Sequence, residues 1–178
     1  MTDQPIHRPG RLLILTGDGK GKSSSAFGMV MRAAGWEMPT CVIQFIKGIR
    51  RTGEQRAAER LGVAWHALGD GFTWDTNNPE KDKETSENIW EFSRETILSD
   101  NYRLVVLDEI LYAIGYGWIS AEDVAAFLTE EKPIRTHVIL TGRGAPQALL
   151  DVADTVTSMT PVKHPFEEGI PAAKGIEL

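Results

Sequence analysis

The chain has 178 residues, of which 42% are hydrophobic and 25% are charged, and its formal net charge at pH 7 is −6. This composition predicts one globular domain over residues 1–178, with residues 1–10 as a flexible N-terminal segment. The acidic balance argues against nucleic acid as a partner, and no apolar run approaches the roughly 20 residues of a membrane span. A single cysteine excludes an intramolecular disulfide, and the polar N-terminus has no signal-peptide core, so we expect a cytoplasmic protein.

Short apolar runs alternate with helical patterns along the chain. An apolar run predicts a strand at residues 11–15, and the spacing of Phe27, Val30 and Met31 predicts a helix over residues 23–34 that Gly35 ends. Ser120 and Asp123 form a capping-box pattern, which predicts that another helix begins there. Further strands are expected at residues 40–46, 63–68, 103–107, 136–140 and 154–158, and further helices at residues 53–61, 79–98 and 146–153.

Because most of these strands are continuously apolar and are followed by a helix, the sequence predicts an α/β fold. Its central sheet should be mostly parallel, with helices on both faces. Ligands of such folds bind beyond the carboxyl ends of the strands, so the residues that follow each strand are the candidates for chemistry.

The stretch LTGDGKGKSSSA, residues 15–26, joins the first predicted strand to the first predicted helix. It nearly matches the phosphate-binding P-loop: Gly21, Lys22 and Ser23 fit, and Thr16 stands where the first glycine should, which is acceptable if that position needs no positive φ. We expect the loop to turn N–H groups toward a phosphate, Lys22 to add a positive charge, and the Ser23 hydroxyl to bind Mg²⁺. A glycine-rich turn without a ligand is the alternative. The predicted nucleotide-binding residues are Thr16, Gly17, Asp18, Gly19, Lys20, Gly21, Lys22, Ser23 and Ser24.

Two acids, Asp108 and Glu109, end the apolar run of the stretch RLVVLDEI, residues 103–110. In P-loop proteins an acid at this place holds Mg²⁺, directly or through water. The pair would also allow one acid to hold the metal and the other to activate a nucleophile, and solvated charges at a strand end are the alternative. The predicted ligands of Mg²⁺ or Mn²⁺ are therefore Ser23, Asp108 and Glu109. These motifs indicate ATP or GTP, and the GTP-specificity pattern N-K-x-D does not occur.

Four further motifs are not those of a generic ATPase: VIQFIKG at residues 42–48, GFTWDT at 71–76, TGRG at 141–144 and PVKHPFEEGI at 161–170. Together with the P-loop and VVLDE, in this order, they resemble the corrinoid adenosyltransferases of the CobA/BtuR type, from about residue 11 to residue 177. The resemblance implies a RecA-like P-loop fold, usually a homodimer, and transfer of the 5′-deoxyadenosyl group of ATP to Co(I) of a corrinoid. Triphosphate is then released, and a reductase or a reduced flavin supplies electrons. The implied setting is cobalamin biosynthesis and salvage.

The resemblance also assigns roles to residues. The P-loop would hold the leaving triphosphate, and Lys22 would stabilise its growing charge. Phe72 and Trp74 would pack against the lower face of the corrin, exclude the axial ligand and make Co(II) easier to reduce. Lys22, Phe72 and Trp74 are therefore the predicted catalytic residues, although the composition alone favours Phe72 and Trp74 as core aromatics. Further predicted ligand-binding residues are Lys47, Arg143, Lys163 and His164.

The C-terminal stretch AAKGIEL departs from the pattern Q-x-G-I-D of this family, so a ligand contact there is not expected with the same residues. Two other function classes remain open at this point. A RecA-like ATPase or kinase would act on the γ-phosphate and release ADP, whereas a non-catalytic ATP- or corrinoid-binding regulator would bind without turnover.

Overall fold

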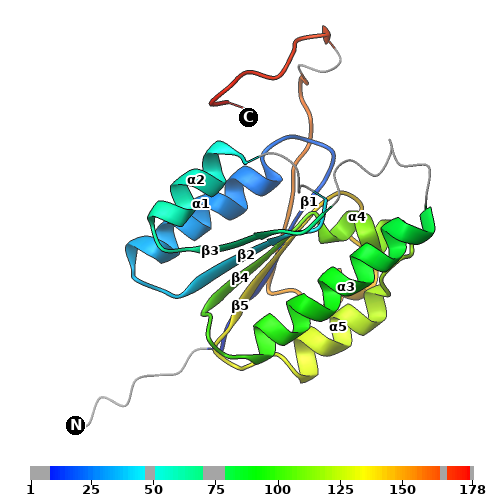
Figure 1. Cartoon of the computed structure of the whole chain (residues 1–178). Helices are drawn as coiled ribbons and strands as arrows, with labels where there is room; N and C mark the ends of the chain where they lie inside the picture. Colours follow the sequence, from blue (N-terminus) through cyan, green and yellow to red (C-terminus); the bar gives the residue numbers. More distant parts are fainter. Residues whose placement is uncertain (1–8, 47–50, 70–78, 165–167, 177–178) are drawn as a thin grey trace.

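In the computed structural model the described residues are 9–46, 51–69, 79–164 and 168–176. Their six strands form one sheet with the order β3-β2-β4-β5-β1-β6, and all neighbouring strands are parallel (Figure 1). The strands are β1 (Leu12–Thr16), β2 (Thr40–Gln44), β3 (Ala64–Ala67), β4 (Leu104–Asp108), β5 (His137–Thr141) and β6 (Thr155–Ser158). The helices are α1 (Lys22–Gly35), α2 (Gly53–Arg60), α3 (Pro79–Leu98), α4 (Ile110–Gly115), α5 (Ala121–Glu130) and α6 (Gln147–Val152). The predicted α/β fold with a parallel sheet is confirmed.

Helices cover both faces of the sheet, as Figure 1 shows: α1 and α2 lie on one face, and α3, α4 and α5 lie on the other. The central strands are therefore buried from both sides. In β4, Val106 packs with Phe27 and Val30 of α1, whereas Leu107 points into the second core cluster with Ile89 of α3. This double burial explains why β4 is a continuous apolar run in the sequence.

The sequence predicted most elements, but it missed α4. The segment ILYAIG is apolar at five of its six residues, so it shows no helical period, and it follows a strand almost without a loop. The Ser120 cap is confirmed, because its Oγ accepts a hydrogen bond from the backbone N–H of Asp123 at 3.1 Å. No helix within the described ranges is long and apolar enough to cross a membrane.

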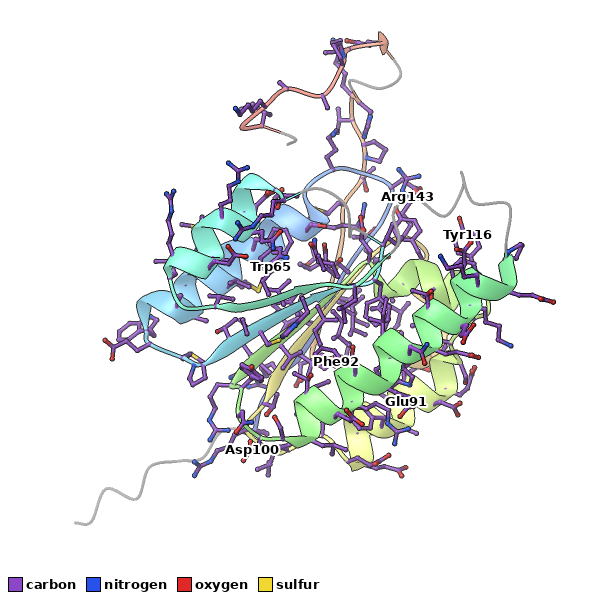
Figure 2. All side chains as sticks on the ribbon, in the orientation of Figure 1. Trp65, Glu91, Phe92, Asp100, Tyr116 and Arg143 are labelled. Atoms are coloured by element: carbon purple, nitrogen blue, oxygen red, sulfur yellow. The ribbon has the colours of Figure 1, made fainter. Side chains whose placement is uncertain are left out.

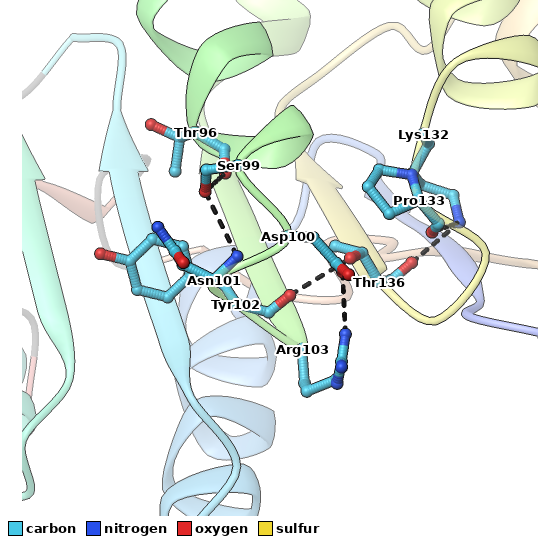
Figure 3. A network of polar contacts seen from close by, with 9 residues as sticks. All are labelled: Thr96, Ser99, Asp100, Asn101, Tyr102, Arg103, Lys132, Pro133 and Thr136. Carbon is cyan, nitrogen blue, oxygen red and sulfur yellow. Dashed lines mark hydrogen bonds and ion pairs between the residues drawn. The ribbon is translucent and has the colours of Figure 1, made fainter.

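Polar contacts close the edge of the sheet where the strands begin (Figure 3). Lys132 Nζ donates a hydrogen bond to the carbonyl oxygen of Thr136 at 2.8 Å, and Thr136 Oγ1 donates to the carbonyl oxygen of Tyr102 at 3.2 Å. An ion pair of 2.9 Å joins Arg103 to Asp100. These contacts tie the turn before β4 to the turn before β5, and so they fix the relative position of the two strands.

Candidate nucleotide-binding site

Three of the sequence motifs meet at the carboxyl edge of the sheet. The P-loop follows β1, the Asp108–Glu109 pair ends β4, and the TGRG segment ends β5. Since β5 lies between β4 and β1 in the sheet, the segments that follow these three strands are neighbours in space. This is the crevice position where parallel α/β sheets bind ligands.

The P-loop lies against Met159, the residue that follows β6. The N–H of Gly19 donates to the carbonyl oxygen of Met159 at 2.7 Å. Gly17 has a φ of 91° and Gly21 a φ of 111°, a backbone region that favours glycine. A Cβ atom on Gly17 would lie 2.5 Å from the carbonyl oxygen of Met159, so a side chain cannot be placed there without displacing backbone.

Thr16 occupies the place of the first P-loop glycine, and the structure explains why a side chain is accepted. Thr16 is the last residue of β1 and is not among the described non-glycine residues with positive φ. Its Oγ1 accepts a hydrogen bond from the N–H of Ala145 at 3.2 Å. The threonine therefore links the P-loop to the segment that carries Arg143.

Lys22 is the first residue of α1, and its side chain folds back over the loop. Nζ donates hydrogen bonds of 2.7 Å each to the carbonyl oxygens of Gly17 and Gly19. Partial burial lowers the pKa of Lys22, with a further lowering from Arg143, while Asp18 and Glu109 act in the opposite direction. The ammonium group thus sits among charged groups at the N-terminus of a 14-residue helix whose first turn contains no acid, which is an arrangement that favours an anion.

The two acids after β4 have different environments. Asp108 is fully buried, and its Oδ1 and Oδ2 accept hydrogen bonds from Thr141 Oγ1 at 2.7 Å and Gln44 Nε2 at 2.9 Å. Glu109 is half-buried and has a φ of 69°, and its N–H donates to Thr141 Oγ1 at 2.9 Å. One carboxylate oxygen of Glu109, Oε2, is buried, and the negative charge of this acid partly offsets the lowering of the Lys22 pKa.

Arg143 is exposed, and its Nε lies 3.7 Å from Asp18 Oδ1 of the P-loop. Gly142 and Gly144 on either side have φ angles of 141° and 64°, and a Cβ on Gly142 would lie 2.6 Å from Leu111 Cβ. The tight packing of Gly142 against α4 therefore turns Arg143 toward the P-loop. Figure 2 shows Arg143 and Tyr116 at the same end of the molecule, with Asp100 at the opposite end.

The remaining predicted site residues lie on other segments of the chain. Lys163 is exposed and forms an ion pair of 2.9 Å with Glu168, and His164 is half-buried next to it. Lys47, Phe72 and Trp74 lie outside the described residues, so their roles remain predictions. The structure adds Gln44 and Thr141, which sequence reasoning missed. The available signal was a polar residue at the end of an otherwise apolar strand.

The donor set around the P-loop fits Mg²⁺ better than a metal that needs a full protein cage. Within the described parts of the chain, no group of three or more His, Cys, Asp or Glu side chains could hold a metal ion. Mg²⁺ in nucleotide sites uses one or two carboxylates together with substrate phosphates and water. Ser23 and Glu109 are both half-buried and are predicted members of such a set, whereas Asp108 is fully buried.

Comparison with known proteins agrees with this geometry over almost the whole chain. Residues 8–178 match the model of the family "ATP:corrinoid adenosyltransferase BtuR/CobO/CobP". A corrinoid adenosyltransferase of a Sinorhizobium species is 45% identical over 172 residues, which are 95% of this chain and 80% of the relative. Those of Pseudomonas aeruginosa and Escherichia coli K12 are 44% and 39% identical, over 95% and 94% of this chain and 84% and 85% of the relatives. The chain therefore belongs to the ATP:corrinoid adenosyltransferase BtuR/CobO/CobP family.

Proposed function

We propose that the protein transfers the 5′-deoxyadenosyl group of ATP to Co(I) of a corrinoid and releases triphosphate, in cobalamin biosynthesis and salvage. Family membership and the names of the relatives support the reaction type. The observation that carries the proposal is that Lys22 lies over the P-loop, bound to the carbonyl oxygens of Gly17 and Gly19, while Arg143 lies 3.7 Å from Asp18 of the same loop. The positive charges of Lys22 and Arg143 suit a polyphosphate. Co(I) of the corrinoid is itself the nucleophile, so the protein does not need to supply one.

In this reaction Co(I) donates an electron pair to C5′ of the ribose, and the Co–C bond forms as the C5′–O bond breaks. The electron pair of that bond leaves with the triphosphate. Lys22, the N–H groups of the loop and the N-terminus of α1 stabilise the charge that grows on this leaving group. Mg²⁺ bound with ATP would neutralise further phosphate charge, and we propose that Ser23 and Glu109 would hold it.

Lys22 has to release its present partners to perform this role. Its Nζ is bound to the carbonyl oxygens of Gly17 and Gly19, both 2.7 Å away. An arriving phosphate offers charged acceptors, and charge-assisted hydrogen bonds are stronger than those to neutral carbonyls. The loop carbonyls therefore hold the ammonium group over the loop that we propose to bind the phosphates.

The proposal extends to residues and partners that the described structure does not include. Phe72 and Trp74 would contact the corrin and exclude the axial ligand of cobalt, and Lys47 would assist in nucleotide binding. A second copy of the chain and a reductase or reduced flavin would complete the system in the cytoplasm. Each of these statements follows from the family resemblance.

Phosphorus-31 NMR of a mixture of protein, Mg²⁺, ATP and a strongly reduced corrinoid tests the proposed reaction. We expect inorganic triphosphate to form in step with a light-sensitive Co–C product. ADP and orthophosphate that form without any need for corrinoid would instead identify an ATPase or a kinase. Tight binding of ATP and corrinoid with neither product would identify a regulator.

A further inference from the structure

A continuous chain of hydrogen bonds crosses four neighbouring strands beneath the candidate site. Trp65 Nε1 of β3 donates to Gln44 Oε1 of β2 at 3.0 Å, and Gln44 Nε2 donates to Asp108 Oδ2 of β4 at 2.9 Å. Thr141 Oγ1 of β5 donates to Asp108 Oδ1 at 2.7 Å. The same Thr141 oxygen accepts the N–H of Glu109 at 2.9 Å, so the chain of bonds ends on the backbone of Glu109.

The two terminal donors of this series, at Trp65 and Glu109, determine which atom donates and which accepts in every hydrogen bond between them. The indole N–H of Trp65 can only donate, so the Gln44 amide must present its oxygen to Trp65 and its NH₂ group to Asp108. The backbone N–H of Glu109 can also only donate, so the Thr141 hydroxyl accepts it and directs its own hydrogen to Asp108. Asp108 thus receives one donor on each oxygen from residues that are themselves held in place.

The series of hydrogen bonds ends at Glu109, a residue with a strained backbone. Glu109 has a φ of 69°, which is unfavourable for a residue with a Cβ, and it immediately precedes α4. Such conformations persist where neighbouring contacts fix them, and here the contact is the bond to Thr141. The left-handed turn at Glu109 starts α4 directly at the end of β4, the sheet edge where the P-loop also lies, and one oxygen of the Glu109 carboxylate is buried there.

We propose that Thr141 is a positioning residue for metal–nucleotide binding: its hydroxyl, anchored on the buried Asp108, fixes Glu109 so that the Glu109 carboxylate contacts the Mg²⁺ of bound ATP. This gives Asp108 a role as an anchor, which differs from the direct metal contact that the sequence predicts. The inference rests on the proposed function, because it takes Mg²⁺ and ATP as the ligands of the P-loop. It assigns no step of the reaction to Thr141 itself.

The test compares the Thr141→Val, Thr141→Ser and Thr136→Val variants. Valine keeps the shape of threonine but loses its hydroxyl, whereas serine keeps the hydroxyl. Thr136 is a matched control, because it is also fully buried next to β5, and its hydroxyl donates to the carbonyl oxygen of Tyr102 at the opposite edge of the sheet. ATP affinity is measured by calorimetry with and without Mg²⁺, and thermal unfolding is measured for each variant without ligands.

We expect Thr141→Val to lose about tenfold or more of the ATP affinity measured with Mg²⁺, which is the usual effect of removing a partner of a metal ligand. Its affinity without Mg²⁺ should remain close to that of the wild type, and Thr141→Ser and Thr136→Val should behave as the wild type in both conditions. If Thr141→Val does not fold, the pair Thr141→Ala and Thr136→Ala replaces it with the same expectation.

Equal losses with and without Mg²⁺, or equal effects of the Thr141 and Thr136 variants, would overturn the inference, because either result would mean that Thr141 is only structural. Failure of the proposed function is recognised separately. In that case wild-type protein binds ATP with Mg²⁺ but forms no Co–C product from reduced corrinoid, and the comparison of variants by calorimetry still decides the role of Thr141.

Discussion

The Nζ atom of Lys22 lies 2.7 Å from the carbonyl oxygen of Gly17, so the backbone of the P-loop orients its own lysine. Replacing Lys22 by Ala removes the cation nearest to the phosphate position. We expect turnover to fall by about 10²–10³, the usual effect of losing one electrostatic contact to a developing anion. Steady-state formation of the alkylated corrinoid measures this effect.

Lys132→Ala is the matched control for that variant. Lys132 is also half-buried, burial also lowers its pKa, and its Nζ also donates to a backbone carbonyl, that of Thr136, at 2.8 Å. It lies at the opposite edge of the sheet, so turnover should stay near the wild-type value. If both lysine variants lost activity alike, the effect would reflect lost stability and would not support a role for Lys22 at the phosphate.

Gly17→Ala should damage both the P-loop and the fold. The residue has a φ of 91°, and a new Cβ would lie 2.5 Å from the carbonyl oxygen of Met159. The left-handed conformation alone is unfavourable for alanine by about 1–2 kcal/mol, and the contact with backbone adds to this. We expect a loss of at least about 2 kcal/mol in the free energy of unfolding, together with loss of ATP binding, as measured by urea denaturation and calorimetry.

Replacement of a second glycine, Gly28, should stabilise the fold, as measured by the same urea denaturation. Gly28 lies in the interior of α1, and a Cβ there would meet no atom within 4 Å. Gly28→Ala should therefore raise the free energy of unfolding by about 0.5–1 kcal/mol through its helix propensity. If Gly17→Ala proved as well tolerated as Gly28→Ala, the packing of the loop against Met159 would not be a constraint.

His137 should make the stability of the fold depend on pH. Its Nδ1 accepts the N–H of Arg11 at 3.0 Å, and burial, with smaller contributions from Lys132 and Arg11, lowers its pKa below the ordinary 6.5. The unfolded chain then binds the proton more readily than the folded one. The stability contribution is complete above about pH 6.5 and is lost as the pH falls below that value toward the lower folded pKa.

His137→Asn isolates this contribution, because the Asn Oδ1 can accept the same N–H and does not titrate. We expect urea unfolding at a series of pH values to show a smaller loss of stability below about pH 6.5 in the variant than in the wild type. Asp154 does not interfere, because the bond from the N–H of Leu12 and the nearby Arg11 lower its pKa from 3.8, and its contribution is lost only in stronger acid. Identical pH profiles would show that His137 is not the titrating group.

Trp74→Ala should separate the reduction of cobalt from the transfer step. If the ring removes the axial ligand of Co(II), the variant loses more activity in assays that begin from Co(II) than in assays that begin from preformed Co(I). Binding of ATP, measured by calorimetry, should remain close to that of the wild type. Equal losses in both assays, or a collapse of ATP binding, would make Trp74 a packing residue.

The sequence predicted the structure best where a local backbone conformation requires one residue type. Gly17 and Gly21 need positive φ angles, and Lys22 follows them in a fixed pattern, so the P-loop could be recognised without a structure. The buried strands were equally clear, because both of their faces are apolar. In both cases the information is local, within a few residues of the feature itself.

Features that depend on strand order could not be predicted in this way. Gln44, Asp108 and Thr141 are far apart in the chain, and although Asp108 was predicted as a metal ligand, no role was predicted for Gln44 or Thr141. Their hydrogen bonds exist because β4 lies between β2 and β5, which no short stretch of sequence specifies. The helix α4 was missed for a related reason, since the αL residue Glu109 that starts it depends on its bond to Thr141.

The contact between the P-loop and Met159 has a consequence for the order in which the protein is made. Gly17 and Gly19 are synthesised long before Met159, although the backbone of Met159, just after β6, supports them. Chains emerge from the ribosome N-terminus first, and a domain generally folds as a unit once its residues have emerged. The phosphate cradle therefore remains without support until residue 159 has emerged, and ATP cannot assist the folding of shorter nascent chains.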